Sequence, residues 1–360
     1  MKQRLLIFHP ALAPYRVDFF SCLAEKFDLM VVFQNRHLRT QKFDQERLGM
    51  NVRFRREYLP HSRLIGGRVL SLGYTRFIRE FRPDIVMGSE FGQTLIVPFL
   101  LRPFMRKRFR LWTLTDDSPS DIKNCNGARL WLRKFFAKRL DGVVAANPVT
   151  AGWYSDGFGI KAPVVPIIAD EGRLRSEVSE LYNLRQDYIS KYGLEGRKVV
   201  LFVGRFNPVK NLPMLLEAFA RVRKDASLVL VGEGEMRSTL ESLARDAGIS
   251  DRIVFTGRME MPELLVWYHV ASVSVLPSTS ERFGAVVGES LQLGCPVVCS
   301  SESGAAWLCD AVVDPRDPDG IAMAINGFLD APSWDSIRPS LMEHDLGYYS
   351  GTLVESIQEN

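Results

Sequence analysis

The 360-residue sequence has no long apolar run and few cysteines. Its longest apolar stretch, residues 94–101, is far shorter than the ~20 residues that a membrane-spanning helix needs. Residues 1–10 have the positive charge of a signal peptide's start without its apolar segment. The five cysteines are scattered and show no metal-ligand spacing, which favours reduced thiols in the cytosol. We therefore expect a cytoplasmic protein without a transmembrane anchor.

Charge is divided unevenly along the chain. Residues 1–160 hold 27 Lys and Arg against 14 Asp and Glu, whereas residues 161–360 hold 19 against 28. Within the basic half, residues 106–110 (RKRFR) and 133–139 (RKFFAKR) interleave cations with aromatics, as membrane-surface helices do. Two interpretations stay open: an uneven solvated surface, or a basic half that faces anionic lipid headgroups or a diphosphate-bearing acceptor. No nucleic-acid-binding module is recognisable, so we expect no nucleic-acid partner.

Short buried-strand patterns alternate with helical patterns through both halves, which predicts an α/β protein with two doubly wound parallel sheets. A proline-stiffened segment, residues 163–170, is the expected connection, placing a first domain at 1–167 and a second at 168–344. Residues 37–68 are polar and predict surface loops and minor strands. In such sheets ligands bind beyond the carboxyl ends of the strands. The polar residues expected at that edge of the first sheet are His9, Glu90, Asp116 and Asp117, with Arg16 and Asp18 where the first loop becomes a helix.

The strongest site signal lies at residues 277–299, which predict a loop, a helix from Ala285 to about 293 and a buried strand. Gly284 falls at the helix start, where it and the amides of Ala285 and Val286 favour a phosphate. Glu281 and Glu289 stand on either side, and carboxylates accept hydrogen bonds from sugar hydroxyls. This pattern fits a ligand with phosphate in its middle and hydroxyls at both ends, such as a nucleotide sugar.

A second loop, after the strand predicted at residues 198–203, carries two cations. Arg205 follows Gly204, and Lys210 comes five residues later. We expect both to neutralise a diphosphate, each charge-assisted bond contributing about 1.5–3 kcal/mol. By contrast, the pair Gly232 and Gly234 is too little of a dinucleotide fingerprint to favour a dehydrogenase.

Residues 281–289 (ERFGAVVGE) resemble the E-x7-E signature of the family 4 retaining glycosyltransferases. The resemblance covers about residues 180–300 and includes three earlier blocks: 200–211 (VLFVGRFNPVKN), 228–234 (LVLVGEG) and 254–258 (VFTGR). The first half of the chain matches the family in outline only. It implies a GT-B fold, with two Rossmann-like domains facing across a cleft and a C-terminal helix at about 345–360 returning to the first. Two departures stand out. Pro10 and Pro14 occur where the family has a glycine pair, and residues 302–306 (ESGAA) replace its Gly-Gly and Glu pattern.

The resemblance implies transfer of a sugar from a UDP- or GDP-sugar to a carbohydrate or lipid-linked glycan with retention, in polysaccharide or lipopolysaccharide assembly. It implies no metal or other cofactor beyond the donor substrate. The basic first half adds the expectation of a peripheral contact with the inner face of a membrane. Catalytic roles fall to Glu281, Arg205 and Lys210, with Asp18 or Asp116 orienting the acceptor. Two rivals stay open: a nucleotide-sugar epimerase or hydrolase, and a non-catalytic donor-binding subunit. The residues expected to bind the donor are Gly204, Arg205, Lys210, Gly257, Arg258, Met259, Phe283, Gly284, Ala285, Val286 and Glu289.

Overall fold

A computed structural model describes residues 2–36, 52–60, 63–65, 68–261, 263–330 and 338–359, with backbone alone at 63–65 and 68–70. The chain divides into two units. One comprises residues 1–117, 121–167 and 346–360, and the other residues 118–120 and 168–345. Part of the polar stretch for which we predicted loops, residues 37–51, lies outside the described residues.

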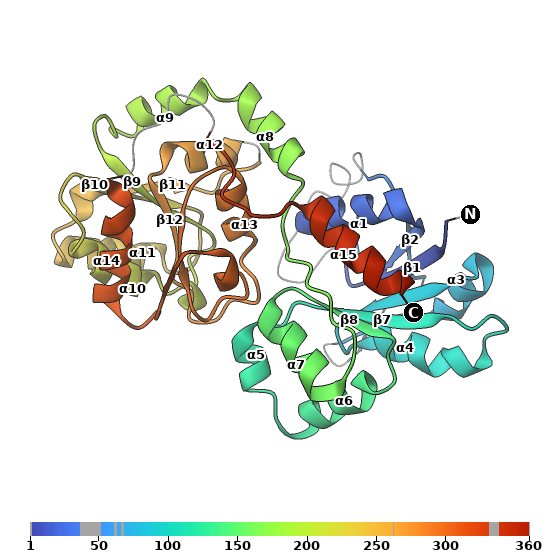
Figure 1. The fold of residues 1–360 in the computed structure, drawn as a ribbon. Coiled ribbons are helices and arrows are strands. Elements are labelled where there is room, and N and C mark those ends of the chain that lie inside the picture. The colour runs from blue at the N-terminus through green and yellow to red at the C-terminus, as the bar shows by residue number, and fades with distance from the viewer. Residues whose placement is uncertain are drawn as a thin grey trace. The chain divides into compact units, whose positions relative to one another are not determined.

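Each unit is built on a six-stranded parallel sheet (Figure 1). The strand order is β3-β2-β1-β6-β7-β8 in the first unit and β11-β10-β9-β12-β13-β14 in the second. In both sheets the chain begins at a central strand, moves to one edge, then returns and builds towards the other, which is the doubly wound arrangement. The predicted α/β class with two such sheets is confirmed.

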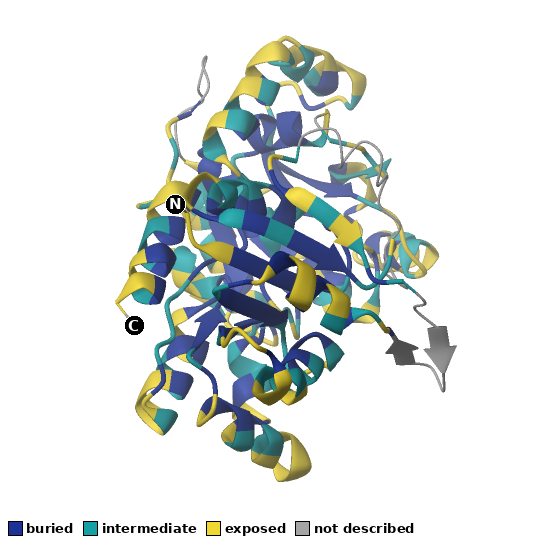
Figure 2. Cartoon of the chain, turned by 90° about the vertical axis from the view of Figure 1, so that its right-hand side faces the viewer, coloured by how far each residue is buried: buried dark blue, intermediate teal, exposed yellow. Residues whose placement is uncertain are grey.

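The first sheet forms because short apolar runs, buried on both faces, suit parallel strands. Leu5, Leu6 and Ile7 of β1 are fully buried, and β1 pairs with β2 and β6 on its two sides. Figure 2 shows mainly buried residues on the strands and exposed residues on the outer faces of the helices. The elements of this unit are β1 (Arg4–His9), α1 (Pro14–Lys26), β2 (Asp28–Phe33), β3 (Arg55–Tyr58), β4 (Arg63–Ile65), β5 (Arg68–Leu70), α3 (Tyr74–Phe81), β6 (Ile85–Ser89), α4 (Gln93–Leu101), η1 (Arg102–Phe104), β7 (Arg110–Thr115), α5 (Pro119–Lys123), α6 (Gly127–Ala137), β8 (Gly142–Ala145), α7 (Pro148–Phe158) and α15 (Leu346–Gln358).

Helix α1 begins at Pro14, two residues before the predicted start. Proline has no N–H to leave unpaired and its φ is already helical, so the first turn suits it. Near the C-terminus, α15 packs against α1, and an arginine of β7 (Arg110) donates to the backbone oxygen of Ile357. The last helix therefore belongs to the first unit, although the whole of the second unit precedes it in the sequence.

The second sheet has the same construction, with its core on both faces of β9 and β10. The sequence pattern did not predict α8. This helix is mostly polar and buries only two residues, Leu174 and Val178, so its apolar stripe is too short to indicate a helix clearly. Among the described residues, no helix combines the length and apolar character needed to cross a bilayer. The elements of this unit are α8 (Glu171–Glu180), α9 (Leu184–Lys191), β9 (Lys198–Val203), η2 (Pro208–Lys210), α10 (Leu212–Ala220), β10 (Ala226–Val231), α11 (Arg237–Asp246), η3 (Ser250–Arg252), β11 (Ile253–Gly257), α12 (Glu263–Val270), β12 (Val273–Leu276), α13 (Ala285–Gln292), β13 (Val297–Ser300), η4 (Ala306–Leu308), β14 (Ala311–Val313) and α14 (Pro318–Leu329).

Candidate active site

Three loops of the second unit follow neighbouring strands at the carboxyl edge of its sheet. The loop of residues 204–211 follows β9, the loop of 277–284 follows β12, and the loop of 301–305 follows β13. Because β9, β12 and β13 are adjacent and parallel, all three loops emerge at the same edge, where ligands bind in sheets of this kind.

The first loop is held in place by two glycines after β10. A Cβ on Gly232 would lie 1.9 Å from the carbonyl oxygen of Gly204, and one on Gly234 would lie 2.4 Å from that of Phe206. The amide of Phe206 donates to the oxygen of Glu233 at 2.8 Å. The glycine pair that suggested a weak dinucleotide fingerprint therefore lets two backbones approach closely and fixes the position of Arg205.

We predict that Gly232→Ala lowers the free energy of unfolding by about 1–3 kcal/mol, because Gly232 has φ +142° and its Cβ position is filled by backbone. Thermal unfolding measures the change. Gly327→Ala is the matched control: a Cβ there meets no atom within 4 Å, so stability should stay equal or rise slightly. Equal stability of the two variants would contradict this account of the loop.

Arg205 is exposed, and its side chain has no hydrogen-bond or ion-pair partner among the residues the structure describes. An unpaired guanidinium at the ligand edge of a sheet can bind a phosphate without first breaking an existing salt bridge.

Lys210 forms an ion pair with Glu281, from the loop after β12. Both side chains are largely shielded from water, at 16% and 19% exposure. Backbone contacts align the two loops: the amide of Thr279 donates to the oxygen of Val209 at 2.9 Å. We expected separate roles for these residues, in phosphate and sugar binding, and the structure places their charged groups in contact.

Asn211 connects the same two loops. Its side-chain amide donates to the oxygen of Pro277 at 3.2 Å and to that of Pro315 at 2.7 Å, and its own backbone is left-handed at φ 55°. Asparagine tolerates that conformation better than most residues. The sequence had shown Asn211 only as the last residue of a matching block.

Gly284 caps α13 with φ +90°, and a Cβ there would lie 2.6 Å from the side chain of Leu276. The amides of Gly284, Ala285 and Val286 have no acceptor among the described residues. The N-terminal turn of α13 therefore presents three free donors, as the sequence predicted for the start of this helix.

The loop after β13 holds this turn from behind. Ser303 donates through its hydroxyl to the oxygen of Phe283 at 2.7 Å, and the amide of Gly304 donates to the oxygen of Glu281 at 3.0 Å. The departure from the family pattern at residues 302–306 thus falls on the segment that supports Glu281 and Gly284.

The cationic and anion-binding groups lie close together at this edge. The ideal Cβ position of Gly204 is 3.7 Å from Cε of Lys210, and that of Gly284 is 3.3 Å from Cγ of Glu281. The Lys210–Glu281 pair therefore bridges the loop that carries Arg205 and the amides that begin α13.

Glu289 lies in the second turn of α13, where the buried hydroxyl of Tyr268 donates to its carboxylate at 3.0 Å. Burial raises the pKa of Glu289, while the Tyr268 hydrogen bond and the positive charge of Arg173 oppose that rise. The charged form is thus disfavoured by its surroundings, and a sugar hydroxyl donating to it would compensate. Tyr268 was not predicted, since a tyrosine in an apolar helix gives no local signal of a polar role.

We predict that Glu289→Gln stabilises the unliganded protein at pH 8 and weakens donor binding. The pKa of the wild-type Glu289 carboxyl is higher in the folded than in the unfolded protein, so the folded protein binds the proton more tightly. The wild-type protein therefore loses stability as the pH rises above the ordinary carboxyl pKa. Glutamine stays neutral and keeps an acceptor for Tyr268. Melting curves at pH 5 and pH 8 should show the wild type losing more stability than the variant; parallel losses would contradict the assignment.

The segment 257–259, which we expected near the nucleobase, begins at the last residue of β11. The oxygen of Gly257 accepts from the amide of Gly232 at 2.9 Å, and Met259 accepts through its sulfur from the indole of Trp267 at 3.0 Å. Arg258 is exposed and pairs with Glu260 at 2.7 Å. Through Gly257, the start of this segment is hydrogen-bonded to Gly232, the glycine that holds the Arg205 loop.

In the first unit, Arg16 is buried and forms an ion pair with Asp116, at the end of β7. His9, at the end of β1, donates through Nδ1 to the oxygen of Ala11 at 2.9 Å. Burial and the charge of Arg16 lower the pKa of His9 to about 4, with Asp116 opposing, so the imidazole is neutral near pH 7. Asp18, expected beside the acceptor, is partly buried on α1. The pairing of Arg16 with Asp116 was not predicted, because 100 residues separate them.

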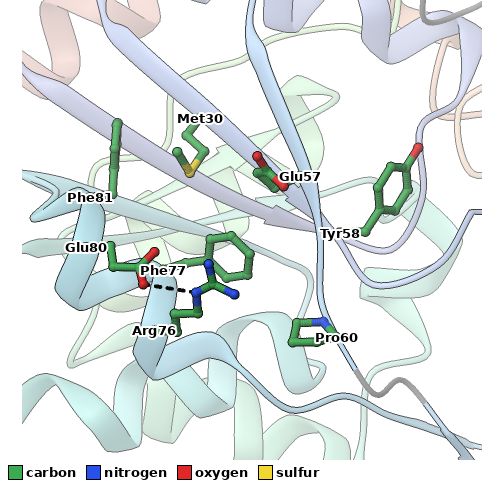
Figure 3. A pocket seen from close by; sticks show the side chains of 8 residues that line it. All are labelled: Met30, Glu57, Tyr58, Pro60, Arg76, Phe77, Glu80 and Phe81. Atoms are coloured by element: carbon green, nitrogen blue, oxygen red, sulfur yellow. Dashed lines mark hydrogen bonds and ion pairs between the residues drawn. The ribbon is translucent and has the colours of Figure 1, made fainter.

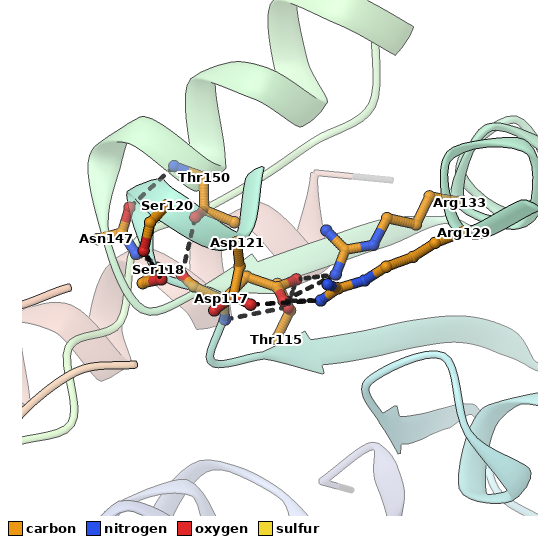
Figure 4. A network of polar contacts seen from close by, with 9 residues as sticks. All are labelled: Thr115, Asp117, Ser118, Ser120, Asp121, Arg129, Arg133, Asn147 and Thr150. Carbon is orange, nitrogen blue, oxygen red and sulfur yellow. Dashed lines mark hydrogen bonds and ion pairs between the residues drawn. The ribbon is translucent and has the colours of Figure 1, made fainter. Parts of the chain in front are cut away.

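Asp117, the neighbour of Asp116, lies in a buried network (Figure 4). Its carboxylate accepts from Arg133 at 2.7 Å, from Arg129 at 3.2 Å and from the hydroxyl of Thr115 at 2.6 Å. Its backbone oxygen accepts from the side chain of Asn147 at 2.7 Å. With these bonds made, Asp117 anchors the end of β7 and is not available to a substrate. Asp116, whose side chain is 24% exposed, is the more accessible carboxylate of the two.

A separate hollow of about 190 Å³ lies between β3 and α3 in the first unit (Figure 3). It is lined partly by the Arg76–Glu80 ion pair, 3.0 Å long, and by the ring of Phe77. None of the predicted site residues lines it, so this hollow is distinct from the site described above.

Comparison with known proteins agrees with this geometry. The model of a family described as glycosyl transferases group 1 matches residues 185–345. The chain is 38% identical over 154 residues to D-inositol 3-phosphate glycosyltransferase 2 of Catenulispora acidiphila, covering 37% of this chain and 35% of the relative. It is 29% identical over 222 residues to a GDP-mannose-dependent alpha-(1-6)-phosphatidylinositol monomannoside mannosyltransferase of Mycolicibacterium smegmatis, covering 57% of each.

The chain thus matches about a third to just over half the length of these curated relatives. Among solved structures, Anabaena Alr3699/HepE in complex with UDP superposes with a TM-score of 0.75 at 17% identity, covering 99% of this chain and all of that one. Residues 185–345 therefore match the glycosyl transferases group 1 model, and the two sheets of the chain make the GT-B fold.

Proposed function

We propose that the protein is a retaining glycosyltransferase of family 4 that moves a sugar from a nucleoside diphosphate sugar to a carbohydrate or lipid-linked glycan. One observation carries the proposal: an unpaired arginine, a lysine–glutamate pair and a helix N-terminus with free amides gather at one sheet edge. Such a combination suits a ligand that carries negative charge and hydroxyl groups together.

The reaction breaks the bond between the anomeric carbon and the diphosphate, so negative charge develops on the leaving phosphate. Arg205, Lys210 and the amides at Gly284 would stabilise that charge, and no metal is needed for this step. The acceptor hydroxyl attacks from the same face and its proton passes to the leaving phosphate, which gives retention. One oxygen of Glu281 accepts from Lys210, while the other has no partner among the described residues and can accept from a sugar hydroxyl.

Glu289 would bind the ribose hydroxyls, and the backbone at residues 257–259 the nucleobase. For the acceptor, we assign orientation to Asp18 and Asp116 of the first unit. Asp116 is held by the buried Arg16, so its position is fixed before any acceptor arrives. The expected setting is polysaccharide or lipopolysaccharide assembly at the inner face of a membrane.

The donor can be identified by a thermal-shift screen of UDP-, GDP- and ADP-sugars. A relative is named for GDP-mannose and a structural neighbour holds UDP, so those two nucleotides come first. A donor at a hundred times its Kd should raise the melting temperature by about 5–10 °C, since binding to the folded state adds about 2.7 kcal/mol. An unchanged melting temperature with every nucleotide sugar would contradict the proposal.

Incubation of the protein with the donor alone separates the transferase from its enzyme rival. A transferase leaves the donor largely intact until an acceptor is added, whereas free sugar or an epimer without acceptor would indicate a hydrolase or an epimerase. The anomeric configuration of the product, read by NMR, then tests retention.

A further inference from the structure

Three large apolar side chains are exposed to solvent on elements of the first unit that are close in sequence or in contact. Leu100, at the end of α4, is 60% exposed, Phe104 of η1 is 79% exposed and Trp131 of α6 is 65% exposed. Single exposed apolar residues are common on soluble proteins, but a cluster of them marks an interaction surface. We call these three residues, with Lys134 and Lys138, the α4–α6 surface.

The two helices are joined beneath this surface by aromatic packing. Trp131 stacks on Phe135 with ring centroids 5.7 Å apart, and Phe135 contacts Phe99 of α4 at 6.0 Å. Lys134 and Lys138 follow Trp131 by three and seven residues, which places them on the same side of α6 or beside its end. Leu100 and Trp131 are therefore exposed on two helices that pack against each other through Phe99 and Phe135.

The two stretches that carry these side chains are rich in cations, and the acids Asp116, Asp117 and Asp121 lie between them in the sequence. Residues 91–115 contain five Lys and Arg, residues 122–140 contain six, and neither stretch contains an Asp or Glu. Four of these cations are paired with acids from outside the two stretches: Arg133 and Arg129 with Asp117, Arg102 with Asp141 and Lys107 with Asp84.

Arg133 therefore turns inward, although we had grouped it with the membrane-facing cations of residues 133–139. The cations that are exposed and have no ion-pair partner among the described residues are Arg106, Arg108, Lys123, Lys134, Lys138 and Arg139.

We propose that the α4–α6 surface binds an anionic lipid bilayer. Tryptophan, phenylalanine and leucine would enter the interfacial region, where amphipathic and apolar side chains are stabilised, while the surrounding lysines and arginines neutralise lipid headgroups. The exposed apolar side chains and the exposed, unpaired cations lie on the same segments of the first unit, which matches that boundary in both polarity and charge. The membrane contact that the sequence suggested for the whole basic half is thereby assigned to the α4–α6 surface.

Flotation with phosphatidylcholine vesicles, with and without phosphatidylglycerol, tests the proposal. We expect the wild type to bind the phosphatidylglycerol vesicles and to be released by salt. Lys134→Glu with Lys138→Glu should weaken binding at least about tenfold, since each cation near the surface contributes about a factor of five. Separately, Phe104→Ser with Trp131→Ser should also weaken binding at least about tenfold, because it removes the two aromatic side chains that would enter the bilayer interface.

The matched controls lie on the second unit. Lys224→Glu with Arg245→Glu reverses two exposed cations, and Met323→Ser removes a side chain that is 75% exposed; both should leave vesicle binding unchanged. Equal binding by all variants, no binding by the wild type, or stronger binding to an RNA oligonucleotide than to vesicles would overturn the proposal. Vesicle binding is independent of the donor screen, so either result can fail alone.

Discussion

Arg205→Ala should lower kcat at least about a hundredfold and leave the melting temperature within about 2 °C of the wild type. The side chain of Arg205 has no partner among the described residues, so its removal breaks no native contact. It would act when charge develops on the leaving diphosphate, and an interaction made in the transition state is lost from kcat rather than from KM alone. Initial rates over a range of donor concentrations separate the two quantities.

Two further variants sharpen that experiment. Arg205→Lys keeps the charge but loses the planar fork that binds phosphate through two parallel bonds, so its kcat should fall between those of the wild type and Arg205→Ala. Arg221→Ala is the control: Arg221 pairs with Glu217 at 2.9 Å on the exposed surface of α10 and its loss should not change the rate. Wild-type kcat in Arg205→Ala would remove Arg205 from the site.

The fold was predictable because its signals are local. The buried strands are short apolar runs, and most helices carry a stripe of apolar residues or a proline or glycine at an end, so the alternation of strands and helices could be predicted from the sequence. The start of α13 at Gly284 was predicted for the same reason, since its glycine, loop and helix are contiguous in sequence. Helix α8 was missed where that local signal is weak.

The internal geometry of the site was not predictable, since it depends on contacts between distant residues. Nothing local at Gly232 indicates that its missing Cβ makes room for the carbonyl of Gly204, 28 residues earlier. Likewise, the ion pairs Lys210–Glu281 and Arg16–Asp116 join loops from different strands. Sequence could place each residue at the ligand edge of its sheet, and only the packing of the loops decides which charges meet.

The same reasoning predicts the largest loss of stability at Asp117. Asp117→Ala should lower the free energy of unfolding by about 3–5 kcal/mol, because it leaves the guanidinium of Arg133 buried without its counter-charge. The side chains of Asp117 and Arg133 are each 4% exposed, so water cannot replace the lost partner. Urea unfolding of both proteins measures the difference.

Asp121→Ala is the matched control, since Asp121 meets Arg129 at 3.5 Å with a quarter of its side chain exposed. A partly solvated pair of this kind contributes about 0–1 kcal/mol. In the double variant Asp117→Ala with Arg133→Leu, the uncompensated charge is gone as well, so its loss of stability should be smaller than the sum of the two single losses. Additive losses would instead mean that the two residues stabilise the fold separately. Asp117 would then not hold the end of β7, and Asp116 with it, through Arg133.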